Sequence, residues 1–353
     1  MIFLKTLLFV NKHLNFQFFT LKILQKLKNI YNIYINMPNL SFERSKGSIP
    51  IALVKGGDYD KEVLFLNSDD SKIKKPKKEI NALNYAKDFK NLGLKTNERT
   101  MMMYKLQEAM MKGIPPNMLM ENDNVKNLYS KIQEDDKNDT SIELPTDSSF
   151  QLIPTPDPKV RQVWYITGQS GSGKSYIARG LAEHYKKIFP EREIYLISKL
   201  NEDSTLDTMK IGKPKRINVQ SLIDDPPDIK EFENCMIIFD DYDSFQDKIG
   251  KVVQQLIDDL AIQGRHTNTT MLCLTHFTTN YKKTRLLLGE TTNIVVYPQS
   301  TSSHALKYLL GTHFGMPKEE LAELKKMGRW VSIGKNYPSY LISEHTAKLL
   351  HQK

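Results

Sequence analysis

The pattern of apolar positions changes near residue 160. From there to the C-terminus, short unbroken apolar runs alternate with longer segments in which apolar residues recur every three or four positions. The short runs are typical of parallel strands buried on both faces of a sheet, and the longer segments are typical of amphipathic helices. This alternation predicts an α/β fold with a mainly parallel sheet flanked by helices. The predicted strands are 163–167, 193–198, 235–240, 270–275 and 293–297, and the helices between them include 175–188 and 248–263.

The first 159 residues have a different pattern. Two apolar runs on either side of the turn-rich Gly56-Gly57-Asp58 predict a β-hairpin over 48–66. Helical periodicity follows at 81–92 and 98–112, and the second segment contains five methionines, which is typical of an adaptable core or a partner groove. Residues 131–159 are polar and contain four prolines, which favours a linker.

These patterns divide the chain into four parts. We expect a basic extension (1–36), a small N-terminal α+β module (37–130), a linker (131–159) and the α/β domain (160–353). The domain closes with helical segments and a predicted hairpin, namely helices at 303–310 and 318–326 and strands at 330–333 and 340–342.

Composition excludes several classes of protein. The chain has 353 residues, of which 40% are hydrophobic and 26% charged, as in ordinary globular proteins and unlike collagen-like or wholly disordered chains. Its two cysteines exclude a disulfide framework and a cysteine-based zinc cluster. The net charge of +9 indicates polyanion binding, but residues 1–36 alone carry five lysines and no acid. More than half of the excess charge therefore belongs to the extension.

The extension itself permits two interpretations. Lysines interrupt it too often to leave the ~18 apolar residues that span a bilayer, and no small-residue cleavage pattern follows, so we predict neither a transmembrane segment nor a signal peptide. It is either a basic amphipathic helix that lies on a membrane or a dispensable extension, helical or disordered. In the second case translation could start at Met37, and a chain starting there would fold and work unchanged.

A phosphate-binding loop follows the first predicted strand of the α/β domain. The segment from Gly168 to Ser175 matches the pattern G-x-x-x-x-G-K-[ST], with a strand before it and a helix after it. Glycines let backbone N–H groups turn toward phosphate oxygens, Lys174 would reach the β- and γ-phosphates, and Ser175 would ligate Mg²⁺. The sequence therefore predicts an ATP- and Mg²⁺-binding P-loop domain with a RecA/ASCE-type sheet. Its nucleotide-binding residues would be Gly168, Gln169, Ser170, Gly171, Ser172, Gly173, Lys174 and Ser175.

An acidic pair ends the strand at 235–240. Four apolar residues lead into Asp240 and Asp241, as in a Walker B strand. Asp240, at the carboxyl end of the strand, would complete the Mg²⁺ site. Asp241 would orient or deprotonate an attacking water. A second carboxylate is needed for hydrolysis by water, and it is not needed by a simple nucleotide kinase.

The strand at 270–275 ends in His276. In P-loop ATPases with an added catalytic strand, that strand lies between the P-loop strand and the Walker B strand, so His276 would sense the γ-phosphate or position water; the alternative is a capping or solvent-facing histidine. The transition state also needs a cation. Arg265 precedes this strand and Arg285 follows it, and either could act as an arginine finger in its own subunit or a neighbouring one.

The order of these motifs resembles the poxvirus-type DNA-packaging ATPases of large DNA viruses, in the FtsK–HerA superfamily. The resemblance covers roughly 160–345, and its most specific part is Gly264-Arg265-His266 ahead of the strand that ends at His276. It implies a homo-oligomeric, ring-forming motor that uses ATP and Mg²⁺ to drive double-stranded DNA into a capsid. It further implies a capsid or internal-membrane partner, and a place in the host cytoplasm (viral factory) or the virion. Many relatives carry Gln at the position of His276 and Glu at that of Asp241.

A DNA motor grips the phosphate backbone with basic side chains on loops. Two groups of residues are candidates, and we expect the first group to face a central channel: Lys210, Lys213, Lys215 and Arg216, then Lys282 and Lys283. The alternative is that they are solvated surface charges. Two other functions also fit a P-loop: a nucleotide or small-molecule kinase, and a non-motor NTP-binding scaffold. The acid pair disfavours the first, and the intact set of P-loop and acidic residues disfavours the second.

Overall fold

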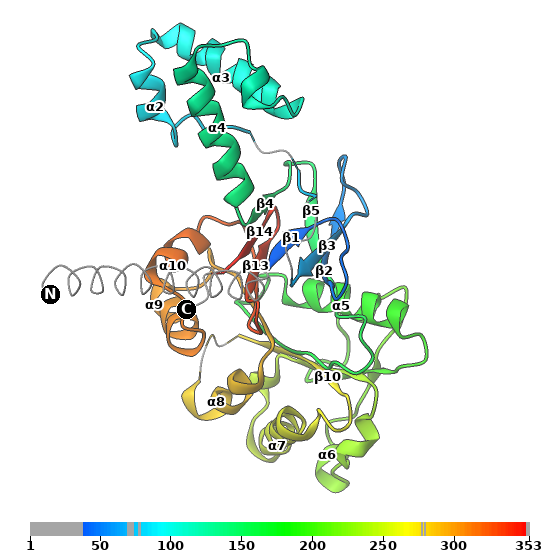
Figure 1. Cartoon of the computed structure of the whole chain (residues 1–353). Helices are drawn as coiled ribbons and strands as arrows, with labels where there is room; N and C mark the ends of the chain where they lie inside the picture. The colour runs from blue at the N-terminus through cyan, green and yellow to red at the C-terminus, as the bar shows by residue number, and fades with distance from the viewer. Residues whose placement is uncertain (1–37, 69–73, 77–78, 277, 279, 351–353) are drawn as a thin grey trace, which may run out of the picture.

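A computed structural model of the chain describes residues 38–68, 74–76, 79–276, 278 and 280–350 (Figure 1). The basic extension and Met37 lie outside the described residues, so the two interpretations of 1–36 stay predictions. Within the described residues, no helix is both long enough and apolar enough to cross a membrane.

A ten-stranded sheet forms the centre of the molecule. Six neighbouring strands are parallel, and four antiparallel strands extend one edge. In spatial order the strands are β4 (Ser141–Glu143), β14 (Thr346–Leu349), β13 (Tyr340–Ser343), β12 (Val331–Gly334), β11 (Asn293–Val296), β6 (Val163–Thr167), β10 (Thr270–Thr275), β9 (Met236–Asp240), β7 (Ile194–Ser198) and β8 (Lys215–Arg216).

The parallel strands confirm the α/β prediction. β10 lies between β6 and β9, with Thr275 opposite Thr167 and Cys273 opposite Phe239. This is the arrangement expected of a P-loop ATPase with an added catalytic strand. The carboxyl ends of the parallel strands therefore meet at one edge of the sheet.

Both faces of the central parallel strands β6, β9, β10 and β11 are buried, which explains their largely apolar sequences. Alternate residues of β6, such as Trp164 and Ile166, face α5 (Lys174–Ile188) and a second sheet. The intervening residues, such as Val163 and Tyr165, face the helices of the other layer. That layer contains α6 (Ser221–Asp224), η2 (Ile229–Phe232), η3 (Tyr242–Ser244), α7 (Asp247–Gln263), α8 (Tyr281–Glu290), α9 (Ser303–Leu306), η4 (Lys307–His313) and α10 (Lys318–Leu324).

The C-terminal elements mostly follow the sequence prediction. The helix expected at 303–310 is present, but it continues from α9 into the π-helical η4. β12 and β13 form the predicted antiparallel hairpin. The pattern analysis missed β14, because a strand of four residues has too few positions to show a period.

The second sheet has four antiparallel strands and packs on the α5 side of the large sheet. Its strands are β1 (Asn39–Ser41), β3 (Val63–Asn67), β2 (Ile49–Lys55) and β5 (Ser149–Leu152), in spatial order. β2 and β3 are the predicted hairpin. Their apolar side chains belong to the same core cluster as Trp164 and Leu181, so this sheet shares its core with the large sheet.

The expectation of a linker at 131–159 was wrong. This segment contains the end of α4 (Asp123–Asn138), the strand β4 at the edge of the large sheet, and β5 in the small sheet. β4 pairs with β14 and β5 pairs with β2, so both strands are stabilised by partners that are remote in the sequence. Local composition, rich in proline and polar residues, could not show these partners.

Three helices form a separate cluster at the top of Figure 1. They are α2 (Ala86–Asn91), α3 (Thr96–Met111) and α4, with the short η1 (Pro116–Met118) between the last two. Leu106 and Tyr129 are fully buried at the centre of this cluster. Of the methionines noted in the sequence, Met102, Met103 and Met110 pack against it, whereas Met101 and Met111 are exposed.

Candidate functional site

The predicted phosphate loop connects the end of β6 to the start of α5. Its conformation depends on glycine, because Gly171 and Gly173 have φ angles of +74° and +111°, in the left-handed region that favours glycine. Gly168 is required for space, since a Cβ there would lie 2.6 Å from the ring of Tyr297. The loop therefore leads directly into the N-terminus of α5, where free backbone N–H groups can bind an anion.

Lys174 points back into this loop. Its side chain is buried, and Nζ donates hydrogen bonds to the carbonyl oxygens of Gly168 at 3.0 Å and Gln169 at 3.3 Å. Asp241 lies nearby, with Oδ1 3.7 Å from Nζ. A buried ammonium group needs such acceptors and a nearby opposite charge. The lysine is thus held where it can meet the phosphates of a nucleotide in the loop.

Asp240 ends β9 in a nearly solvent-free position. Only 3% of it is exposed, and its Oδ2 accepts a hydrogen bond of 2.9 Å from Oγ of Ser198. Burial, followed by repulsion from Asp241, raises the pKa of Asp240 to about 6. A buried carboxylate with too little positive charge around it suits a divalent cation, and a carboxylate with the Ser175 hydroxyl supplies the hard oxygen donors that Mg²⁺ prefers. The two residues therefore fit the predicted metal site.

Asp241 and His276 form the second part of the site. Oδ2 of Asp241 lies 2.9 Å from Nε2 of His276, and both side chains are about one-third exposed. Nδ1 of the same ring lies 3.4 Å from Nζ of Lys174. The structure thus brings together three of the predicted catalytic side chains, Lys174, Asp241 and His276.

Backbone geometry explains this meeting. Asp241 has a φ of +44°, an uncommon conformation for a non-glycine residue, and it turns the chain sharply after β9. Asp243, two residues later, accepts hydrogen bonds from Oγ1 of Thr275 at 2.9 Å and from the backbone N–H of His276 at 3.0 Å. Asp243 therefore fixes the tip of β10 beside β9. The sequence analysis missed Asp243, although an acid so close to the predicted acidic pair was a signal.

Two other residues next to the loop were also missed. Nη2 of Arg329 donates a hydrogen bond of 3.2 Å to the carbonyl oxygen of Gly171. The hydroxyl of Tyr297 is buried without a hydrogen-bond partner among the described residues, and it would lie 3.7 Å from a Cβ at Gly173. Burial raises the pKa of Tyr297 well above its usual value, so the phenol stays a neutral donor. Arg329 precedes β12, and only the antiparallel extension of the sheet brings it to the loop.

The two candidate arginine fingers lie in different places. Arg265 is exposed and precedes β10, at the sheet edge where β6 begins, opposite the phosphate loop. It therefore cannot reach the phosphates of its own subunit, and a role toward a neighbouring subunit stays a prediction. Arg285 is exposed in α8, which follows the tip of β10, so its position is compatible with a role at the edge of the site.

The candidate DNA contacts are only partly available. Arg216 forms two hydrogen bonds with the carboxylate of Asp207, at 3.1 and 2.7 Å, and Lys215 pairs with Glu193 at 3.1 Å. These two residues form β8, and are not in a loop as the sequence analysis expected. Lys210 and Lys213 are exposed in the preceding loop. In the second group Lys283 is exposed in α8, and the side chain of Lys282 is outside the described part of the structure.

Comparison with known proteins identifies a viral relative. The chain is 30% identical over 222 residues to a protein described as uncharacterized protein V3, from the Sputnik virophage, and the match covers 62% of this chain and 88% of V3. The chain belongs to the family of V3. No protein-family model matches the chain.

Similarities to solved structures are weaker. Genome packaging NTPase B204 of Sulfolobus turreted icosahedral virus 2, in complex with AMP, is 14% identical; the match covers 51% of this chain and 94% of B204, with a TM-score of 0.37. Conjugation coupling protein TcpA of pCW3, with ATPγS, is 13% identical over 84% of this chain and 77% of TcpA, with a TM-score of 0.35.

Proposed function

We propose that this V3-family protein is an ATP-hydrolysing motor that drives double-stranded DNA into a viral capsid. The observation that carries the proposal is the contact between Asp241 and His276 at the tip of β10, beside Lys174 of the loop. A nucleotide-binding loop alone would fit many functions. A phosphate loop whose lysine contacts both a carboxylate and a histidine fits an enzyme that hydrolyses the nucleotide with water.

Binding is the first task of these residues. The loop N–H groups and the ammonium of Lys174 would hold the phosphates, and the guanidinium of Arg329 lies close enough to the loop to add positive charge. Ser175 and Asp240 would hold Mg²⁺, which neutralises charge on the β- and γ-phosphate oxygens when bound. Together these groups account for ATP and Mg²⁺ as the expected substrate and cofactor.

The tautomer of the neutral His276 ring follows from its neighbours. The ammonium of Lys174 can only donate a hydrogen bond, so Nδ1, 3.4 Å away, is the acceptor. The proton of the neutral ring is therefore on Nε2, and it is donated to Oδ2 of Asp241. This hydrogen bond orients the carboxylate. Asp241 can then accept the proton of a water molecule that attacks the γ-phosphate.

Coupling to DNA needs further parts. A cation at the transition state would come from Arg285, or from Arg265 of an adjacent copy, which is why we propose a ring of identical subunits. The exposed Lys210 and Lys213 are the best-placed of the first basic group to grip phosphates of DNA in a channel. The sequence resemblance to DNA-packaging ATPases and the membership of a virophage protein family both support a viral setting.

One assay tests the proposal against its alternatives. Phosphate release from ATP is measured with and without double-stranded DNA, and the Lys174→Ala variant provides the inactive control. Hydrolysis that DNA stimulates is the expected result. Phosphoryl transfer to a small acceptor would instead support a kinase, and slow turnover that DNA does not change would support a scaffold. Either of these two results would contradict the motor.

A further inference from the structure

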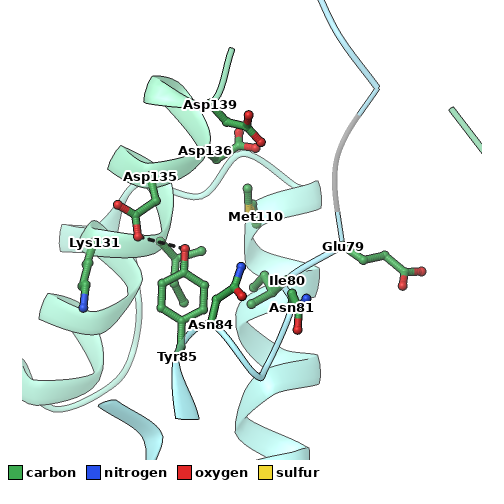
Figure 2. Close-up of a pocket in the computed structure, with 11 residues that line it drawn as sticks. Glu79, Ile80, Asn81, Asn84, Tyr85, Met110, Lys131, Asp135, Asp136 and Asp139 are labelled. Carbon is green, nitrogen blue, oxygen red and sulfur yellow. Dashed lines mark hydrogen bonds between the residues drawn. The ribbon is translucent and has the colours of Figure 1, made fainter. Parts of the chain in front are cut away.

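Helix α3 carries apolar side chains on two opposite faces. Its inner face packs within the helical cluster, where Leu106 and Ala109 are buried. On the same side Met110 lines a cavity of about 380 Å³ between α3, α4 and the segment that contains Tyr85, and Figure 2 shows the residues that line this cavity. Tyr85 donates a hydrogen bond of 3.0 Å to Asp135 of α4. Packing within the cluster therefore accounts for the apolar residues of only one face of α3.

The outer face of α3 is exposed. Met101 is 74% exposed, Tyr104 66% and Met111 45%, and Glu108 on the same face is also exposed. These four positions are separated by three, four and three residues, so they form one stripe along the helix. The same spacing defines the contact positions of a coiled coil. A largely apolar stripe that no part of the described chain covers is typical of a protein–protein contact.

Exposed apolar side chains continue on both sides of this stripe. Met118 and Met120 are both more than two-thirds exposed, and the ion pair of Lys105 with Glu121 holds their segment beside α3. Leu83 is also more than two-thirds exposed, and it lies in the other segment that packs against α3. The apolar surface is therefore wider than a single row of side chains, as a helix–helix contact requires.

The order of side chains along the stripe is self-complementary. Met101 and Met111 each lie five residues from position 106, and Tyr104 and Glu108 each lie two residues from it. A second copy of α3 in the antiparallel direction would thus place Met101 against Met111 of the second copy. The same arrangement places Tyr104 against Glu108 of the second copy, where the phenol can donate a hydrogen bond to the carboxylate.

A parallel arrangement of two α3 helices has no such match. It would place Glu108 against Glu108 of the second copy, and two carboxylates at close range repel each other. Glu108 is ionised, because a hydrogen bond from Lys112 lowers the pKa of its carboxyl. The helix dipoles also favour the antiparallel direction, since each N-terminus then lies near a C-terminus. The side chains of the stripe therefore select one orientation.

We propose that the outer face of α3 binds a second copy of this chain through an antiparallel, two-fold contact between the two α3 helices. Two copies close such a contact, so it is separate from the head-to-tail contacts of the proposed ring and needs neither nucleotide nor DNA. The helical cluster stands apart from the large sheet in Figure 1, so the contact leaves the phosphate loop accessible.

The size of α3 sets the expected affinity. A helix of 16 residues is about 24 Å long. A contact centred on it is smaller than the ~1,600 Å² of a standard interface, so we expect a Kd in the micromolar range. The pairing should therefore be reversible and should depend on protein concentration.

Sedimentation of the full chain without nucleotide measures the pairing, over concentrations from about 1 to about 200 µM. Tyr104→Glu should weaken it by roughly tenfold or more, because a new carboxylate would face Glu108 of the second copy. Tyr104→Lys should retain it, because an ammonium group would face that carboxylate. Both variants change an exposed side chain, so both should fold. Tyr337→Glu is the matched control, since Tyr337 is a tyrosine, 76% exposed, in the turn between β12 and β13.

Cross-linking tests the orientation. The native Cys235 and Cys273 are buried, so new cysteines on the outer face of α3 can be modified selectively. A short bismaleimide should link a chain with Met101→Cys to a chain with Met111→Cys. It should link neither variant to itself, because the two copies of residue 101 would lie about 15 Å apart along the helices. Links formed within each variant alone would indicate a parallel pair and would overturn the proposal.

Two other results would also refute it. A full chain that stays monomeric at all these concentrations would show that α3 does not bind a second copy, whichever segment or protein covers it instead. Association that Tyr104→Glu leaves unchanged would place the contact on another face. Lys174→Ala should pair as the wild type does, so a failure of the proposed ATPase function and a failure of this inference are distinguishable.

Discussion

Nε2 of His276 lies 2.9 Å from Oδ2 of Asp241, while Nδ1 of the same ring lies 3.4 Å from Nζ of Lys174. One imidazole therefore connects the lysine of the phosphate loop with the carboxylate that follows β9. This connection exists because β10 lies between β6 and β9, so that its tip reaches both. A change in what Lys174 contacts can thus be transmitted through His276 to Asp241.

We predict that His276→Ala lowers kcat for ATP hydrolysis more than it changes KM. Without the imidazole, Asp241 loses the hydrogen bond that orients it toward water. Lys174 loses only its 3.4 Å contact with Nδ1 and keeps its hydrogen bonds to Gly168 and Gln169. A loss of roughly 10² in kcat is in the range for a positioned acid–base group. Steady-state kinetics over a range of ATP concentrations gives both constants.

His276→Gln is the informative companion variant. The amide of glutamine can donate a hydrogen bond to Asp241, so kcat should recover in part. His266→Ala is the control, because His266 is exposed in the loop before β10 and faces no site residue in our assignment. Equal kcat for the wild type and His276→Ala would show that the contacts of His276 with Lys174 and Asp241 have no part in hydrolysis.

We predict that Asp240→Asn stabilises the protein in the absence of nucleotide and Mg²⁺ at pH 8. The pKa of Asp240 in the folded protein is about 6, above its usual 3.8, so ionisation is unfavourable in the fold. The associated stability is fully present below pH 3.8 and is lost as the pH rises through 6. Removing the charge should raise the free energy of unfolding at pH 8 by up to about 3 kcal/mol.

The pH dependence distinguishes this effect from a general one. Thermal unfolding of the wild type and the variant should give similar midpoints at pH 4 and diverge above pH 6, with the variant more stable. The same variant should lose Mg²⁺-dependent nucleotide binding, because an amide is a weaker ligand for Mg²⁺ than a carboxylate. Asp224→Asn, at an exposed position in α6, should change neither property. A variant that is less stable than the wild type at pH 8 would contradict the prediction.

Arg329 should contribute to nucleotide affinity. Its guanidinium donates a hydrogen bond to the carbonyl oxygen of Gly171 in the loop, and it can also form charge-assisted hydrogen bonds with phosphate oxygens. We predict that Arg329→Ala weakens ATP binding by roughly tenfold, as expected for one such bond, and that Arg329→Lys recovers part of the loss. Arg44→Ala, which removes an exposed arginine elsewhere, is the matched control, and titration calorimetry measures all three. Unchanged affinity in Arg329→Ala would exclude a role in binding.

The sequence predicted the parts of the site that lie at the ends of parallel strands. The loop, Asp240, Asp241 and His276 each follow an apolar run, and parallel strands bring their carboxyl ends together. The predicted order of strands, with the strand before His276 in the middle, was confirmed. Such a prediction is feasible because the position of each residue depends only on the strand before it and on the rule that the carboxyl ends of parallel strands lie at the same edge of the sheet.

The remaining residues depend on pairings between distant segments. Arg329 reaches the loop only because the antiparallel strands extend the sheet, and β5 is held in place by its pairing with β2. β4 and β5 are three and four residues long, too short for a pattern, and they lie in a segment that composition assigned to a linker. The hydrogen bonds of Asp243 with Thr275 and His276 depend on how the ends of β9 and β10 lie relative to each other. None of these contacts leaves a local signal of period two or 3.6 in the sequence.

The structure reduces the number of residues in the first basic group that we expect to contact DNA. We expected Lys210, Lys213, Lys215 and Arg216 to contact DNA together. Arg216 is instead paired with Asp207, and hydrogen bonding from Arg216 lowers the pKa of that carboxyl. Lys215 is paired with Glu193. Lys210 and Lys213 are both exposed, and Lys213 has only a weak charge interaction with Asp207, so the phosphate contacts should depend on these two.

We therefore predict that the double variant Lys210→Ala/Lys213→Ala loses most of the stimulation of ATP hydrolysis by double-stranded DNA. Each phosphate contact contributes about 0.9 to the slope of log K against log salt, so the slope should fall by roughly 2. Arg216→Ala is the contrasting variant: it removes the guanidinium that pairs with Asp207, so it should lower the melting temperature and leave the salt slope unchanged. Stimulation that is intact in the double variant would mean that DNA binds another face, with Lys283 on α8 as the next residue to test.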